Sequence, residues 1–239
     1  MPGPAGIGIV ACAITSNSAA MKNFIRNNSL SLVFILLFVL SLCGQVVTGF
    51  KEHNQFLEAH HQQPLGVSAY LKTGHFVQAT MENWESEFLQ MALFVLFTIF
   101  LYQKGSSESK DPEGGAEEVD KEPDPSKPDA PRPVKKGGLL LSLYKNSLFL
   151  ALLTLFLLTF YLHLKGSQMD YNEEQVLKGE PTQTMGAFLT NSKFWFESFQ
   201  NWQSEFLSVF SLAVLSIFLR QKGSPQSKPV DAPNSKTGE

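Results

Sequence analysis

The sequence has little cysteine, no basic excess and no recognisable catalytic motif. Its 239 residues include only two cysteines, Cys12 and Cys43, too few for a disulfide framework or a cysteine metal site. A formal net charge of −3 argues against nucleic acid as a partner, because nucleic-acid binders present a concentrated basic face. The sequence contains no Ser-His-Asp arrangement and no phosphate-binding glycine loop. We therefore expect no enzyme activity and no cofactor.

Long apolar runs are the main feature that is present. A helix needs roughly 20 largely apolar residues to cross the ~30 Å hydrocarbon core of a membrane. Two of the four runs nearly reach that length, and the other two need the polar, Trp-containing segments before them, 83–88 and 201–206. The runs are Ser31–Val47, Phe88–Tyr102, Ser147–Leu164 and Phe206–Leu219. The pattern predicts four transmembrane helices, which contain few polar residues near the middle of the bilayer.

The tryptophans support this reading. Trp84, Trp195 and Trp202 all fall on the same side of the predicted spans. Indole rings favour the headgroup level of a bilayer, so we expect these three residues to be interfacial anchors.

The first run has two readings. Lys22 and Arg26 before an apolar run are typical of a secretory signal, and Cys43 would fit a lipoprotein. Leu42, however, stands where lipoprotein cleavage needs a small residue, and NSL at 28–30 recurs before the third run at 146–148. We therefore predict a retained span, preceded by an unstructured extension, residues 1–20.

An internal repeat accounts for several matches. NWESEFL at 83–89 corresponds to NWQSEFL at 201–207, and QKGSSESK at 103–110 corresponds to QKGSPQSK at 221–228, both at an offset of 118. Because two spans return the chain to its starting side, the copies must be parallel. We predict repeat 1 over 21–110 and repeat 2 over 139–228.

The basic residues predict the orientation. Fourteen of the 19 Lys and Arg residues precede the first span, lie between the second and third, or follow the fourth. By the positive-inside rule, both termini and the central linker are cytoplasmic. The linker, 111–138, is acidic and rich in Pro and Gly, so we predict that it is disordered, as is the tail, 229–239. The two outer loops, about 30 residues each, are long for structureless connections, and their segments AYLKTGHF (69–76) and AFLTNSKF (187–194) share aromatic and Leu positions. We therefore predict a short helix at the outer surface in each loop.

A polar seam follows the start of the second and fourth spans. If the second helix begins near Phe76, its polar residues are spaced 3, 4 and 3 and share one face. The second copy repeats this spacing. The predicted seam is Thr80, Asn83, Glu87, Gln90, Ser198, Asn201, Glu205 and Ser208.

Glu87 and Glu205 are the candidate functional pair in this seam. Two carboxylates in a low-dielectric cleft resist joint ionisation, so the pair could hold a proton or share a cation. The alternatives are structural anchoring near the interface and a seam that binds a partner. Four histidines, His53, His60, His61 and His75, fall in the first outer loop, but their spacing matches no metal-ligand pattern, so no metal site is predicted.

The segments NWESEFLQ, FLYQKGSSESKDP, FWFESFQNWQSEFL and SIFLRQKGSPQSK resemble a family of bacterial integral membrane proteins known only as a domain of unknown function. The resemblance runs from about Met21 to the end. It implies a bacterial inner-membrane protein and supplies no activity, substrate or catalytic residue.

We therefore expect an all-α membrane protein with four transmembrane helices, arranged as two tandem parallel repeats in the bacterial inner membrane. The preferred function is a structural or interaction protein of the envelope, whose partners are the lipid bilayer and another membrane protein or a second copy. The alternative is a small transporter or channel with a Glu87/Glu205 proton or cation site.

Overall fold

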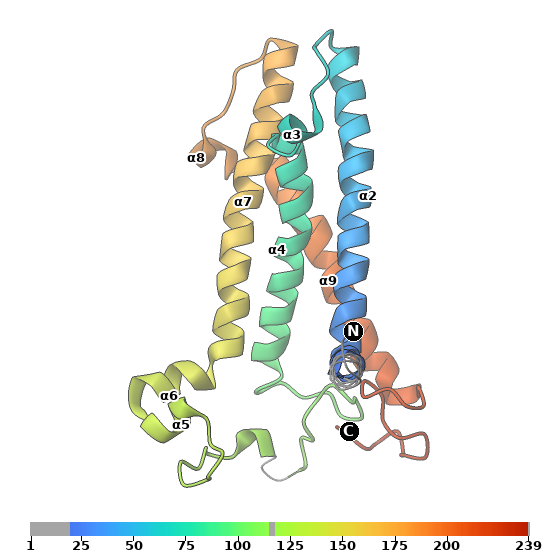
Figure 1. Ribbon diagram of the computed structural model, residues 1–239, viewed down its shortest axis with the longest axis vertical. Coiled ribbons are helices and arrows are strands. Elements are labelled where there is room, and N and C mark those ends of the chain that lie inside the picture. The colour runs from blue at the N-terminus through green and yellow to red at the C-terminus, as the bar shows by residue number, and fades with distance from the viewer. Residues whose placement is uncertain (1–19, 115–117, 239) are drawn as a thin grey trace, which may run out of the picture. The chain divides into compact units, whose positions relative to one another are not determined.

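The computed structural model describes residues 20–114 and 118–238. Every regular element in these residues is helical, which confirms the all-α class (Figure 1). The chain divides into two compact units, Met1–Leu71 and Lys72–Glu239. This division falls inside the first predicted repeat, and the repeat boundaries stay a prediction.

In the first unit, a short helix is fixed to the end of a long one. The helices are α2 (Ser29–Ala59) and α3 (Val67–Tyr70). The Asn54 side chain donates to the Leu65 carbonyl (3.1 Å) and accepts from the Leu65 N–H (2.8 Å). Tyr70 is buried, and its ring centroid lies 5.9 Å from that of Phe50 and 5.8 Å from that of His53. These contacts hold α3 against α2.

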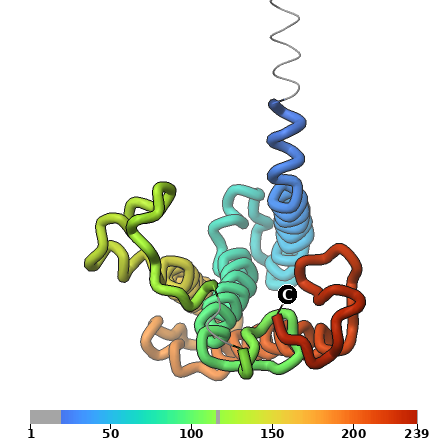
Figure 2. Tube along the Cα trace, turned by 90° about the horizontal axis from the view of Figure 1, so that it is seen from below, coloured from blue at the N-terminus to red at the C-terminus, as the bar shows by residue number. Residues whose placement is uncertain are grey.

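The second unit is built around α4. Its long helices are α4 (Gly74–Phe97), α7 (Ser147–Lys178) and α9 (Ser192–Phe218), and its described short helices are η1 (Glu118–Asp120), α5 (Arg132–Lys136), α6 (Gly138–Lys145) and α8 (Met185–Phe188). Both α7 and α9 pack against α4 (Figures 1 and 2). Side chains from these three long helices therefore meet inside this unit.

Two glycines let α4 and α7 pack closely. A Cβ atom added at Gly74 would lie 2.2 Å from the backbone nitrogen of Asp170, and one added at Gly166 would lie 2.6 Å from that of Gln78. Both obstacles are backbone atoms, which no side-chain movement can clear. Small residues allow such close approach of membrane helices.

The α7–α8 connection repeats the arrangement of the first unit. The Asn172 side chain donates to the Gln183 carbonyl (2.9 Å) and accepts from the Gln183 N–H (2.8 Å). These two residues lie 118 positions after Asn54 and Leu65. A small core of Leu164, Phe188 and Phe194 packs beneath α8.

The predicted outer loops are too long. α2 continues to Ala59 and α7 to Lys178, whereas the predicted apolar runs ended at Val47 and Leu164. Polar residues continue each helix because helix formation requires no apolar stripe once a turn is nucleated. The short helix predicted in each loop is confirmed as α3 and α8.

The linker contains short helical turns, namely η1 and α5. Its residues 115–117 lie outside the described residues, as do residues 1–19 of the predicted extension (1–20) and the last tail residue. In the tail region, Lys228 Nζ donates to the carbonyls of Asn234 (3.0 Å) and Lys236 (2.9 Å). The disorder of the linker and the tail stays a prediction.

Two of the described helices, α2 and α7, are long and apolar enough to cross a membrane. By length and composition alone, these two helices are weak evidence for a membrane protein, and the finer expectation of four spans is not confirmed. α4 carries Glu82, Glu85 and Glu87, and these charges lower its average apolarity. Such residues are costly inside a bilayer unless they are paired within the protein.

Candidate functional site

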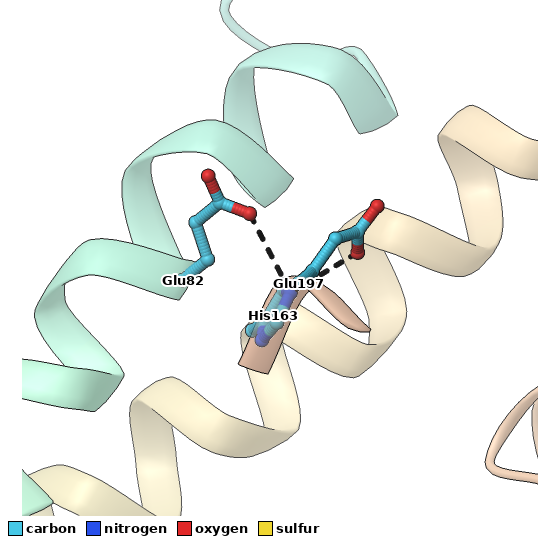
Figure 3. A group of neighbouring side chains, drawn as sticks. All are labelled: Glu82, His163 and Glu197. Carbon is cyan, nitrogen blue, oxygen red and sulfur yellow. Dashed lines mark hydrogen bonds and ion pairs between the residues drawn. The ribbon is translucent and has the colours of Figure 1, made fainter. Parts of the chain in front are cut away.

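The side chain of His163, on α7, is completely buried among carboxylates from α4 and α9. Its Nδ1 lies 2.6 Å from Glu85 Oε2, and its Nε2 lies 3.4 Å from Glu197 Oε2 and 3.9 Å from Glu82 Oε2. Figure 3 shows Glu82 and Glu197 on either side of the imidazole. We call Glu82, Glu85, His163 and Glu197 the histidine cluster.

Helical spacing places these side chains together. Glu82 and Glu85 are three residues apart, so they share one face of α4. On α7, positions 159, 163, 166, 167 and 170 also share a face, and they hold Thr, His, Gly, Ser and Asp. Gly166 brings this face against α4. The Phe194 ring, 4.9 Å from the imidazole between centroids, covers the cluster from α9.

A neighbouring donor orients each carboxylate. Trp202 Nε1 donates to Glu85 Oε1 at 3.0 Å, and Gln78 Nε2 donates to Glu82 Oε2 at 2.8 Å. Ser167 Oγ donates to Glu197 Oε2 at 2.5 Å. Fixed hydrogen bonds of this kind hold buried charged groups in one geometry.

A second charged group adjoins the cluster. Lys193 Nζ lies 3.1 Å from Asp170 Oδ2, 3.8 Å from Glu174 Oε1 and 4.0 Å from Glu197 Oε1. Lys193 therefore pairs with carboxylates from both α7 and α9.

Two protonation states of His163 give both of its ring nitrogens a role in this arrangement. An imidazolium donates from both ring nitrogens, to Glu85 on one side and toward Glu197 on the other. A neutral imidazole that donates from Nδ1 to Glu85 turns the lone pair of Nε2 toward Glu82 and Glu197. The ligand atoms of Glu82, His163 and Glu197 lie within 4.8 Å of one another, close enough to hold a metal ion.

The polar seam forms mainly local hydrogen bonds. Thr80 is buried and donates to the Phe76 carbonyl (2.8 Å), and Asn83 is exposed and donates to the Ala79 carbonyl (2.8 Å). Gln90 lines an apolar groove between α4 and α9.

The second copy of the seam behaves alike. Asn201 donates to the Glu197 carbonyl (3.0 Å), and Ser208 donates to the Glu205 carbonyl (2.8 Å). Ser198 is buried, and its hydroxyl has no hydrogen-bond partner among the described residues. These hydrogen bonds of the seam therefore stay within single helices.

An electrostatic interaction links the two residues of the predicted carboxylate pair, and its role stays a prediction. Glu205 is half-buried on α9, Glu87 is exposed on α4, and the charge of Glu87 acts on Glu205. This pair is separate from the histidine cluster, whose members are Glu82, Glu85 and Glu197.

The predicted anchors are partly buried, and two make hydrogen bonds within the protein. Trp195 Nε1 donates to the Leu189 carbonyl at 2.8 Å, and Trp202 donates to Glu85. Trp84 is half-buried. A place at the headgroups stays a prediction for all three, and Trp202 additionally orients a member of the histidine cluster.

Sequence reasoning missed the whole histidine cluster. It weighed the four histidines of residues 53–75 and did not consider His163, which lies inside the apolar run Ser147–Leu164. A signal was present: His163, Gly166 and Asp170 have helical spacing of 3 and 4, which places polar and small residues on one face of an otherwise apolar helix.

Comparison with known proteins identifies the family. A search of curated proteins and a search of solved structures found no match. A family model described as "Domain of unknown function (DUF6766)" matches residues 21–239. The chain therefore belongs to this family of domains of unknown function.

Proposed function

We propose that the chain is an integral protein of the bacterial inner membrane that crosses the bilayer four times, with both termini cytoplasmic. The length and apolarity of α2 and α7 support two crossings. The remaining two are assigned to α4 and α9, whose acidic residues pair with α7 or lie near the predicted interface. The distribution of basic residues supports the orientation.

The proposed spans form two parallel repeats. α2, α3 and α4 begin at residues 29, 67 and 74, and α7, α8 and α9 begin at 147, 185 and 192. The offset is 118 in each case, the same as in the sequence. The equivalent hydrogen bonds of Asn54 and Asn172 add support that helix positions alone do not supply.

Within this frame we assign the protein a structural or interaction role in the envelope. The observation that carries this proposal is an apolar groove between α4 and α9, lined chiefly by Leu93, Phe94, Phe97, Phe206, Val209 and Phe210. A groove lined by aromatic side chains fits the apolar face of a partner helix better than an ion pathway. A second copy and another membrane protein are both partners of this kind, and no catalytic role is proposed.

Photo-crosslinking in the native membrane tests this role. A photoreactive amino acid replaces Phe210, in the groove, and in a control protein replaces Val119, an exposed apolar residue of the linker. We expect a discrete protein adduct from position 210 and none from 119. Adducts with lipid alone at position 210 would contradict the interaction role.

A small transporter or channel is the second candidate. The observation that favours it is the electrostatic interaction of Glu87 with the half-buried Glu205, a pair that could hold a proton or share a cation. The double substitution of Glu87→Gln and Glu205→Gln should abolish proton or cation flux in reconstituted vesicles but leave assembly intact. The absence of flux in the wild-type protein would eliminate this candidate.

A further inference from the structure

We propose that Glu82, His163 and Glu197 form a binding site for one divalent first-row transition-metal ion. This inference goes beyond the proposed interaction role and does not depend on it. The three ligands come from α4, α7 and α9, so the ion would join all three long helices of the second unit.

The distances suit a metal ion after a small contraction. Zn²⁺ binds imidazole nitrogen and carboxylate oxygen at about 2.0–2.2 Å, so neighbouring ligand atoms of a tetrahedral site lie about 3.4 Å apart. In the structure, His163 Nε2 lies 3.4 Å from Glu197 Oε2 and 3.9 Å from Glu82 Oε2. Movement of the Glu82 side chain alone would close the site, and Glu82 is its least buried ligand, 15% exposed.

The surrounding hydrogen bonds match those of metal sites. A metal-bound histidine usually donates its other ring N–H to a carboxylate, which fixes the tautomer and the ring orientation. Glu85 Oε2 stands 2.6 Å from His163 Nδ1 in this position, and Trp202 in turn fixes Glu85. Ser167 and Gln78 orient the two ligand carboxylates. The three helices therefore supply both the ligands of a metal site and the residues that orient those ligands.

The excess of carboxylates around His163 also favours the binding of a cation. Five carboxylates, Glu82, Glu85, Glu197, Asp170 and Glu174, surround His163 and Lys193. Lys193 lies on the far oxygen of Glu197, Oε1, and leaves Oε2 directed at the imidazole. Unpaired charge is costly in a buried site. One divalent ion would reduce the excess of negative charge.

The ligand types indicate the class of ion. One imidazole and two carboxylates suit Zn²⁺, Mn²⁺ and Fe²⁺, whereas Mg²⁺ and Ca²⁺ favour sites made only of oxygen. Three protein ligands leave a coordination position for water.

Metal titration of the full chain tests the proposal. The protein is purified in detergent with an affinity tag that contains no histidine, stripped with a chelator, and titrated with Zn²⁺, Mn²⁺ or Mg²⁺ by calorimetry. We expect one equivalent of Zn²⁺, weaker binding of Mn²⁺, and no competition by Mg²⁺. X-ray absorption of the zinc protein should show a single imidazole ligand.

Matched variants assign the binding to these residues. His163→Gln should lower zinc affinity by more than 100-fold and remove the imidazole signal, and Glu85→Gln should lower it by about 10–100-fold. Glu82→Gln, at the most exposed ligand, gives a second variant should His163→Gln fail to fold. His61→Asn and Glu113→Gln, at exposed positions, should leave affinity unchanged.

Three results would overturn the proposal. They are failure of the wild-type protein to bind zinc, unchanged binding by folded Glu82→Gln or His163→Gln, and an absorption spectrum without imidazole.

Discussion

The helices α2 and α7 carry the same joint to a following short helix. Asn54 and Asn172 each make two hydrogen bonds to a residue 11 positions later, and the one-turn helix that follows buries an aromatic side chain, Tyr70 or Phe188. Each joint is therefore held by contacts between a long helix and the segment that directly follows it in the chain.

The faces of these two helices differ. The positions of α2 that lie 118 residues before His163 and Gly166 hold Gln45 and Thr48. The Thr48 hydroxyl donates to the Gly44 carbonyl of its own helix at 2.8 Å. At these two positions α2 has neither the imidazole nor the glycine, so the face that α7 presents to α4 has no counterpart on α2.

Of the substitutions that test this difference between α2 and α7, loss of Glu85 should lower the stability of the protein most. Glu85→Ala leaves His163 Nδ1 and Trp202 Nε1 buried without their acceptor, and breaking a buried pair of this kind costs about 3–5 kcal/mol. We expect a large fall in the thermal unfolding temperature in detergent. Glu87→Ala, an exposed control two residues away, should change stability by less than about 0.5 kcal/mol. Equal effects would show that the cluster is not a buried network.

The second-largest loss of stability should come from a methyl group added where α7 crosses α4. Gly166→Ala places a Cβ 2.6 Å from the backbone of Gln78, and the resulting overpacking costs about 1–3 kcal/mol. The matched change Gly44→Ala on α2 meets no atom of the described residues within 4 Å beyond its own helix backbone, and it should be neutral or slightly stabilising. Denaturant titration followed by circular dichroism measures both. A neutral Gly166→Ala would contradict the close packing of α4 on α7.

The two joints should respond alike. Asn54→Ala and Asn172→Ala each remove two hydrogen bonds from a half-buried connection, at a cost of about 1–3 kcal/mol. Hydrogen exchange at the connections 60–66 and 179–184 should rise similarly in the two variants. A marked response at only one joint would weaken the proposed duplication.

The helix caps give the smallest effect. Thr73 accepts a hydrogen bond from the Phe76 N–H at the start of α4, and Asn191 accepts one from the Lys193 N–H at the start of α9. Replacing either by Ala should cost about 0.5–2 kcal/mol, measured by thermal unfolding. The serine variants, which keep a capping oxygen, should lose less. No difference between Ala and Ser would argue against capping.

Local sequence patterns predicted much of the frame but not the site. The apolar runs located all four long helices, and the length of the outer loops predicted the short helices α3 and α8. Helix ends were missed at Ala59 and Lys178 because polar turns continue a helix without an apolar signal. The histidine cluster joins residues up to 115 positions apart, so only the packing of α4, α7 and α9 reveals it.

Cysteine accessibility tests the central claim, the four-span topology, most directly. With Cys12 and Cys43 replaced by Ala, single cysteines are placed at Gln63, Ser126, Glu180 and Ser235, and cells with permeabilised outer membranes are treated with a thiol reagent that cannot cross the inner membrane. We predict labelling at 63 and 180, and labelling at 126 and 235 only after the inner membrane is opened. Positions 126 and 235 on opposite faces, or 63 and 180 on opposite faces, would contradict two parallel repeats.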